Sequence, residues 1–174
     1  FKQKTAYEIY QCDWSSDVCS SDLIRATLAD LQPILGFQER AYHENRAIKG
    51  VEPLPLSVDY TGLFAFMEFW IEGPLDHPEG LVILDPTHEP PGDALYIWSI
   101  ATAPEQRGKG LGNRLLDFVE ARAKALNRRA VTLVTNSRLP ERIAWYLRHD
   151  FVIMRHETLA DRTIVHMRKN LASD

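Results

Sequence analysis

The chain has 174 residues, with 20 Lys and Arg against 24 Asp and Glu, which gives a formal net charge of −4. This length suits one domain with a substantial core, and the near-balance of charge excludes a general nucleic-acid binder, which shows a basic face or a high pI. Because no apolar run approaches the roughly 20 residues that span a bilayer, we expect a soluble, single-domain, cytoplasmic protein without a membrane or nucleic-acid partner.

The first 23 residues differ from the rest of the chain. Back-translated in one reading frame, "FKQKTAYEI" at residues 1–9 and "DWSSDVCSSDL" at residues 13–23 both resemble parts of a common short-read sequencing adapter. We interpret residues 1–23 as translated adapter outside the domain, with the gene's own start lost, and a signal peptide is excluded because there is no apolar core segment. Both cysteines, Cys12 and Cys19, lie there, so no disulfide or metal site is predicted.

The first half of the domain, from Ile24 onward, mixes short strands with helical spacing. Asp30 is a plausible N-cap for the helix that follows it, and glycine and proline interrupt the region around residues 44–58. The expected elements here are a strand stub at Ile24–Ala26, a helix after Asp30, a helix over Asp59–Met67, and strands at Glu68–Glu72, Leu81–Asp85 and Ala94–Ala101.

The second half alternates more cleanly. Apolar residues from Leu111 to Leu126 share one face of a helix that closes near Asn127. The remaining expected elements are a strand at Ala130–Val134, a helix from Pro140 to about His149, and a terminal hairpin of "FVIMRHE" and "RTIVHMR" around the turn "TLAD". This order predicts an α/β (α+β) fold in which helices cover a mixed sheet.

The stretch "IATAPEQRGKGLGNRLLDFVE", residues 100–120, places Gly108, Gly110 and Gly112 between a strand and an amphipathic helix. Glycines let the backbone approach a ligand closely, and N–H groups at a helix N-terminus bind anions. A pyrophosphate is the expected ligand. The ATPase P-loop requires an ending in GK[ST], and the dinucleotide fingerprint requires GxGxxG; this stretch has neither.

The run Arg107–Gly112, RGKGLG, matches the R/Q-x-x-G-x-G/A signature of the GNAT superfamily of N-acetyltransferases, and the chain resembles that family over residues 24–171. "VTLVTN", "AWYLRHDFV" and the final hairpin are similar to the family's next strand, tyrosine-bearing helix and C-terminus. Asp150 departs from the pattern, because a glycine usually precedes the phenylalanine. The resemblance implies a mostly antiparallel, twisted sheet of about seven strands with helices on both faces.

The resemblance also implies acetyl-CoA as cosubstrate, bound in the gap between the strands at Ala94–Ala101 and Ala130–Val134. Tyr146 matches the tyrosine that protonates the leaving thiolate, and Asn136 matches an amide partner of the cofactor. The residues expected to bind the cofactor are Ile100, Ala101, Thr102, Arg107, Gly108, Lys109, Gly110, Leu111, Gly112, Asn136 and Tyr146.

Trp98 stands where related sequences often carry a glutamate that deprotonates the amine. An indole cannot act as a base, so Glu68 on the neighbouring strand is the leading substitute for the general base. Trp98 and Tyr42 are candidates for the acceptor pocket. The other candidates are weaker: His156, Glu157 and His166 for the base, and His43, Tyr60 and Trp70 for the cleft.

Two functions follow from this pattern. The first is acetyl-CoA-dependent N-acetylation of a primary amine, on a small molecule or a peptide, by direct attack. The second, motivated by Trp98, is a non-catalytic acyl-CoA-binding or sensor module. The acceptor stays open among peptide N-terminus, lysine, polyamine and small metabolite, and the protein is expected to be a monomer or homodimer.

Overall fold

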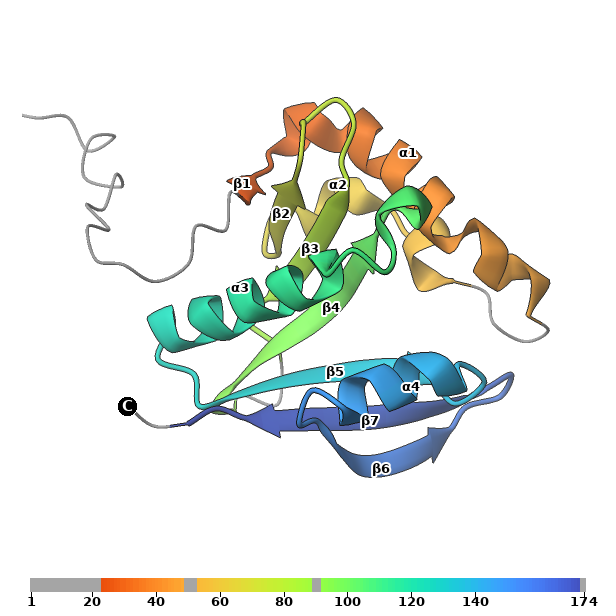
Figure 1. The fold of residues 1–174 in the computed structure, drawn as a ribbon, viewed down its shortest axis with the longest axis vertical. Helices are drawn as coiled ribbons and strands as arrows, with labels where there is room; N and C mark the ends of the chain where they lie inside the picture. The colour runs from red at the N-terminus through yellow and green to blue at the C-terminus, as the bar shows by residue number, and fades with distance from the viewer. Residues whose placement is uncertain (1–22, 49–52, 89–91, 173–174) are drawn as a thin grey trace, which may run out of the picture.

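The computed structural model describes residues 23–48, 53–88 and 92–172, which form one seven-stranded sheet with helices on both faces (Figure 1). The strands are β1 (Ile24–Arg25), β2 (Glu68–Glu72), β3 (Gly80–Asp85), β4 (Ala94–Thr102), β5 (Ala130–Asn136), β6 (Val152–Thr158) and β7 (Thr163–Asn170). The α-helices are α1 (Leu31–Tyr42), α2 (Tyr60–Leu63), α3 (Leu111–Ala125) and α4 (Pro140–Leu147). Short 3₁₀ turns are η2 (Leu28–Asp30), η3 (His43–Ala47), η4 (Leu54–Leu56) and η5 (Pro104–Gln106). The predicted fold class is confirmed.

The sheet order is β1-β2-β3-β4-β5-β7-β6. Every neighbouring pair is antiparallel except β4 and β5, which are parallel. A parallel pair needs a crossover connection, and α3 provides it, lying beside β4 in Figure 1. The turn before α3 therefore lies at the C-terminal end of β4.

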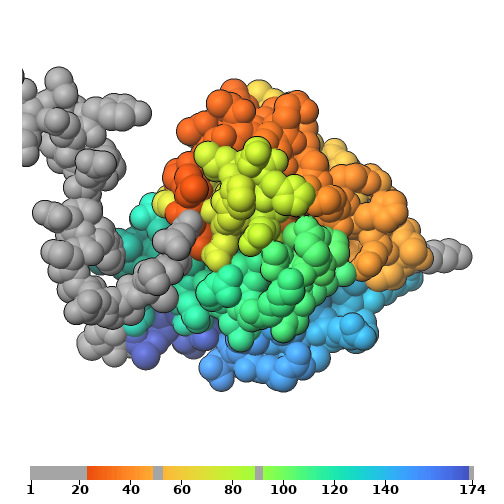
Figure 2. All heavy atoms as spheres, turned by 45° about the horizontal axis from the view of Figure 1, so that its top comes forward, coloured from red at the N-terminus to blue at the C-terminus, as the bar shows by residue number. Residues whose placement is uncertain are grey.

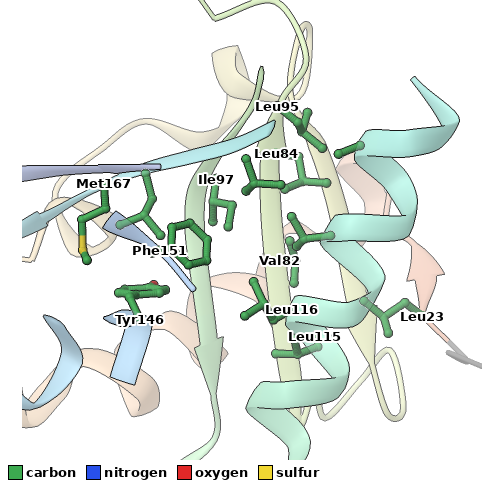
Figure 3. Packing of buried hydrophobic residues seen from close by; sticks show 14 of the residues in the cluster. Leu23, Val82, Leu84, Leu95, Ile97, Leu115, Leu116, Tyr146, Phe151 and Met167 are labelled. Atoms are coloured by element: carbon green, nitrogen blue, oxygen red, sulfur yellow. The ribbon is translucent and has the colours of Figure 1, made fainter. Parts of the chain in front are cut away.

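Two apolar clusters lie on opposite faces of the sheet. Alternation along β3 separates them, because Val82 and Leu84 join the cluster under α3 and α4, whereas Leu81 and Ile83 join the cluster under α1 and α2. All six residues of β3 are buried, as expected of a strand covered on both faces. Figure 3 shows the first cluster, with Tyr146 of α4 beside Phe151 at its edge.

Most predicted elements occupy their expected residues, and the strand at Glu68–Glu72 matches residue for residue. The helix expected over Asp59–Met67 was too long, since α2 ends at Leu63. Beyond it, Phe64 stacks on Phe69 with the ring centroids 3.9 Å apart, and Met67 is buried, so the chain bends down onto the sheet. None of the helices in the described residues is both long and apolar enough to cross a bilayer.

Two aspartates lie next to the ends of secondary-structure elements, where the sequence had raised a question about each. Asp150, which stands in place of the family's usual glycine, has φ +65°. This left-handed conformation is one that aspartate tolerates better than most residues, so the turn before Phe151 forms without glycine. Asp30 precedes α1 as expected, but its carboxylate accepts hydrogen bonds from the Thr27 amide and hydroxyl at 2.8 and 3.0 Å and does not cap the helix.

Leu23 is the one residue of the proposed adapter segment that the structure describes, and it is buried in the cluster beneath α3 (Figure 3). We expect a chain that starts at Leu23, behind an initiator methionine, to melt within about a degree of the full chain. A chain that starts at Ile24 loses one buried leucine, so we expect it to be less stable by roughly 1.5–3 kcal/mol.

Thermal melts and urea titrations of the two truncated chains would measure this difference. The adapter interpretation of residues 1–22 is contradicted if removing them alone lowers the free energy of unfolding as much as also removing Leu23.

Candidate functional site

The two central strands pair over only part of their length. β4 and β5 are in register from Ala94 opposite Ala130 to Ile97 opposite Leu133, and then diverge (Figure 1). At the same level, the register between β3 and β4 passes from Ile97 to Ser99 and leaves Trp98 as an extra residue. This is a β-bulge, which bends a strand and redirects its side chains. Beyond Ile97, the edge of β4 that faces β5 has no strand partner in the described part of the chain.

A cavity of about 420 Å³, here the β4–β5 cavity, occupies this divergence. Its lining is mainly apolar and aromatic, with polar groups toward the hairpin turn and α4. The described residues that line it are Tyr42, Asn45, Pro53, Leu54, Pro55, Tyr96, Ile97, Trp98, Ser99, Ile100, Leu133, Val134, Thr135, Asn136, Leu139, Arg142, Tyr146, Leu159, Asp161, Arg162 and Ile164. An apolar cavity with a few polar groups is typical of a small-molecule site.

A second cavity of about 600 Å³, here the turn cavity, lies between the end of β4, the glycine turn and α4. Its described lining residues are Ala41, Ile100, Ala101, Thr102, Gln106, Arg107, Gly108, Gly110, Gly112, Asn113, Glu141, Arg142, Trp145 and Tyr146. Figure 2 shows the turn, in green, at the surface between α1 in orange and α4 in blue. Ile100, Arg142 and Tyr146 line both cavities, so the two meet there.

The glycine turn has the geometry of an anion site. Gly108 and Gly110 have φ of +74° and +81°, and a Cβ at either position would meet no atom within 4 Å. Gly110 is the N-cap of the 15-residue helix α3, with no side-chain cap. The first N–H groups of a helix lack partners inside the helix and favour negative charge. The open space above the turn leaves these groups accessible to a phosphate.

The side chains of the other residues predicted to bind the cofactor in this turn each have their own surroundings. Leu111 is buried in the core, so only its backbone is available to a ligand, and Lys109 is exposed and lines neither cavity. The guanidinium of Arg107 donates to Glu44 at 2.6 Å and to the carbonyl of Ala41 at 3.2 Å. The hydrogen bond from Arg107 lowers the pKa of the Glu44 carboxyl. Arg107 therefore ties the turn to the end of α1.

Tyr146 lies where the cavities meet. Its ring packs edge-on against Trp145 and Phe151, with centroid distances of 5.1 and 5.3 Å. Within the described part of the chain, its hydroxyl has no hydrogen-bond partner. Burial raises the pKa of Tyr146, although the positive charge of Arg142 opposes that shift. The phenol is consequently protonated at neutral pH and is available as a donor.

The structure brings Tyr42, Trp98 and Asn136 together around the β4–β5 cavity. The Tyr42 hydroxyl is 3.0 Å from Ser99 Oγ, which fixes the ring at the cavity wall. Trp98 packs edge-on against Tyr60, with the centroids 6.0 Å apart. Asn136 Oδ1 accepts a hydrogen bond from the backbone N–H of Arg138 at 2.9 Å. Asn136 is therefore near the acceptor candidates and not in the turn cavity.

The structure does not bring Glu68, the predicted substitute base, into this group. Glu68 lies on the face of β2 toward α3, where Arg122 donates two hydrogen bonds to it at 2.9 and 2.6 Å and Arg25 is 3.3 Å away. The indole N–H of Trp70 donates at 3.0 Å. Burial would raise the pKa of Glu68, but the hydrogen bonds from Arg122 and Trp70 and the charges of Arg122 and Arg25 together lower it. It lines neither cavity.

The weaker candidates are also outside the cavities. His166 pairs with Glu157 at 2.7 Å across the terminal hairpin, and Trp70 packs against Phe118 under α3, with the centroids 4.9 Å apart. Tyr60 donates its hydroxyl to the carbonyl of Pro55. His43 and His156 are exposed. None of these candidate side chains lines either cavity.

Sequence reasoning missed Arg142, Asp161 and Arg162. Arg142 precedes Tyr146 by four residues on α4, and that spacing places two side chains on the same face of a helix. Once Tyr146 had been identified as a candidate, this spacing could have identified Arg142 as its neighbour. Asp161 and Arg162 belong to the expected hairpin turn, but only the fold shows that this turn closes over β4 and β5.

Comparisons with known proteins agree with this geometry. A model of the Acetyltransferase (GNAT) family matches residues 6–151, beginning inside the segment that we interpret as adapter. Among curated proteins, none matches closely enough to count as a relative.

Solved structures share the fold at low sequence identity. A GNAT-family protein from Desulfovibrio desulfuricans is 19% identical with a TM-score of 0.68, covering 86% of this chain and 98% of its own. A Bacillus subtilis acetyltransferase solved with CoA is 14% identical with a TM-score of 0.64, covering 86% and 98%. The ribosomal-protein-S18-alanine N-acetyltransferase of Escherichia coli is 14% identical with a TM-score of 0.64, covering 87% and 94%. Since the family model spans most of the chain and the parallel pair diverges beside a glycine turn, this protein belongs to the GNAT family of acetyltransferases.

Proposed function

We propose that this protein is an acetyl-CoA-dependent N-acetyltransferase that acts on a primary amine, with Tyr146 as the general acid. One observation carries the proposal: a buried phenol, without a hydrogen-bond partner among the described residues, lies where the turn cavity meets the β4–β5 cavity. In this arrangement one cavity holds the acyl donor, the other holds the amine, and a proton donor stands between them.

The turn cavity fits the phosphates and the pantetheine arm of acetyl-CoA. The glycine turn and the first N–H groups of α3 would hold the pyrophosphate. At Ile100–Thr102, β4 pairs with β3 on one edge, and its other edge has no strand partner among the described residues. That free edge offers backbone groups to the pantetheine amides. The cosubstrate supplies an acetyl group activated as a thioester, and the chain's own residues position it and manage protons.

Atoms and protons balance through Tyr146. The amine nitrogen bonds to the acetyl carbon, the carbon–sulfur bond breaks, and the leaving thiolate takes the proton of the Tyr146 hydroxyl. The nitrogen that attacked releases one proton to solvent as it becomes an amide. The phenolate of Tyr146 takes up one proton from solvent, so the balance is restored. The raised pKa of Tyr146 keeps this donor protonated in the pH range where amines react.

The β4–β5 cavity has no carboxylate at Trp98, and among its described lining residues the one carboxylate is Asp161. The hydrogen bond from Arg162 lowers the pKa of Asp161, which makes it a weak base. The acceptor therefore reacts as the neutral amine. The nearby charge of Arg142 favours that form, since a cation disfavours a second cation.

This mechanism predicts the pH profile of the reaction. kcat/KM should rise about tenfold per pH unit below the pKa of the amine and level off above it, because only the neutral fraction reacts. Rates for two acceptors of different basicity, measured from pH 6 to 10, should have inflections that move with each amine. An inflection that stays at one pH for both amines would assign the base to the protein.

A branched side chain in the glycine turn should weaken cosubstrate binding. Gly110→Val forces a β-branched residue into a left-handed conformation, and its methyl groups extend into the open space where phosphate approaches. We expect coenzyme A affinity, measured by calorimetry, to fall roughly tenfold or more, or about 1.4 kcal/mol. Gly36→Val, at an exposed helical glycine with equal room, is the matched control. Unchanged affinity in folded Gly110→Val would refute this placement.

The enzyme and the alternative sensor module are separated by turnover. The purified protein is given acetyl-CoA and a panel of primary amines, and free thiol is followed over time. Thiol release that depends on the amine, with an acetylated product by mass spectrometry, supports the transferase. Binding of coenzyme A without amine-dependent release supports the sensor, which Trp98 at the usual glutamate position favours.

A further inference from the structure

Among the described residues that line the β4–β5 cavity, one positive charge has no partner of opposite sign. The described lining residues include three that carry full charges: Asp161, Arg162 and Arg142. Asp161 and Arg162 pair with each other, since Arg162 Nε is 3.0 Å from each carboxylate oxygen. Arg142 has no ion pair or hydrogen bond within the described residues.

Arg142 is held in place by packing. It is half-buried, and its guanidinium carbon is 5.5 Å from the ring centroid of Tyr42. A guanidinium over an aromatic face is attracted by the ring and keeps its N–H donors free at the edges. Because Tyr42 is itself anchored by Ser99, the donors of Arg142 have a defined position where the two cavities meet.

The ligand that such a group recognises is an anion, and carboxylates match the guanidinium fork. Polyamines fit poorly, because they bring further positive charge to a cavity whose described lining is already positive. The other lining residues indicate the chemical character of the remainder of the ligand. Trp98, Leu54 and Leu139 contribute aromatic and aliphatic surface, which suits an apolar side chain.

The position of Arg142 beside Tyr146 limits the spacing between amine and carboxylate. The two residues are one helical turn apart on α4, which brings their side chains to the same face. The reacting amine must reach the thioester next to Tyr146. An α-amino acid carries its amine and its carboxylate on one carbon, so a carboxylate at Arg142 leaves the amine beside Tyr146.

We propose that the acceptor is a free α-amino acid with an apolar side chain, and that Arg142 binds its carboxylate. This inference rests on the proposed transferase function and names its substrate class. A peptide N-terminus lacks the carboxylate on that carbon and leaves Arg142 unpaired.

Two matched series of amines test the proposal. The first is L-phenylalanine, L-phenylalaninamide and 2-phenylethylamine, and the second is L-leucine, L-leucinamide and isoamylamine. Within a series the apolar body is constant, while the carboxylate is present, replaced by an amide or absent. Spermidine represents the polyamines. Rates of thiol release are expressed per concentration of neutral amine, so that differences in basicity do not enter.

We expect kcat/KM for the amino acid to exceed that for its amide by roughly tenfold to a hundredfold, the worth of a hydrogen-bonded ion pair. Arg142→Gln should bring this ratio close to one, and Arg142→Lys should retain part of it. Arg148→Gln, at an exposed arginine outside both cavities, should keep the wild-type ratio. If Arg142→Gln does not fold, the ratios measured for the wild type and for Arg142→Lys still test the role of Arg142.

The outcomes separate the two proposals. Faster turnover of the amides, the simple amines or spermidine overturns the amino-acid acceptor and leaves the transferase standing. A preference for amino acids that survives in folded Arg142→Gln overturns the assignment of Arg142. Absence of thiol release with every amine overturns the proposed transferase, and the acceptor with it.

Discussion

Replacing Tyr146 with phenylalanine is expected to lower kcat by roughly a hundredfold. General acids contribute 10²–10⁴-fold, and the lower end applies here because the thiol of coenzyme A is acidic for a leaving group. The ring contacts with Trp145 and Phe151 survive the substitution, so the fold and the KM for acetyl-CoA should change little. A fall in kcat at constant KM indicates an interaction made in the transition state.

Tyr60→Phe is the matched control for this experiment. Tyr60 is also buried, but its hydroxyl bonds to Gln38 and to the carbonyl of Pro55, and it lines neither cavity. Its loss should cost stability, about 1 kcal/mol per hydrogen bond, with little effect on kcat. If Tyr146→Phe turns over as fast as the wild type, Tyr146 is not the acid, and the proton comes from solvent or from the ammonium.

Glu68→Ala should destabilise the protein by about 3 kcal/mol while leaving kcat/KM of the folded protein unchanged. Removing one partner of a buried ion pair costs 3–5 kcal/mol because the other charge remains. The lower value applies, since the Arg122 and Arg25 side chains are 29% and 45% exposed. Urea unfolding measures the loss. Glu39→Ala, at an exposed pair with Arg46, should cost less than 1 kcal/mol.

The sign of the pH dependence follows from the lowered pKa of Glu68. A carboxyl whose pKa is lower in the folded state stabilises the fold at pH above its unfolded pKa, and that contribution is lost as the pH falls through the folded pKa. We therefore expect the stability difference between wild type and Glu68→Gln to be constant near neutral pH. It should shrink below the ordinary pKa of 4.5. A difference that grows in acid, or a loss of kcat at neutral pH, would contradict the structural assignment.

The sequence predicted the elements where periodicity and glycine placement act locally. The alternation in β3, the apolar face of α3 and the turn at Gly108 and Gly110 all depend on near neighbours in the chain. The resemblance to a family added the divergence of β4 and β5, which the structure confirms. The length of α2 could not be predicted from local periodicity, because the next residue, Phe64, is engaged in a tertiary contact with Phe69 of β2.

The surroundings of Glu68 could not be predicted from the sequence for the same reason. A carboxylate on a strand next to β4 is consistent with a base, but its partner Arg122 is 54 residues away on α3. Only the packing of that helix against the sheet shows that the charge is already paired. Arg142 is the opposite case. It was not singled out in the sequence, because its significance depends on having no acidic partner within the described residues.

The short parallel pairing between β4 and β5 has a consequence for folding cooperativity. Among the described residues, four pairs join the strands β1–β4 to the strands β5–β7 within the sheet. The other connections are the core beneath α3 and a few side-chain contacts, such as Arg142 on Tyr42. Regions linked by few contacts open as separate cooperative units at free energies below that of global unfolding. A ligand that bridges both cavities contacts strands on either side of this junction. Its binding therefore joins two partly independent units into one, so that the ligand sets the cooperativity of unfolding as well as its midpoint.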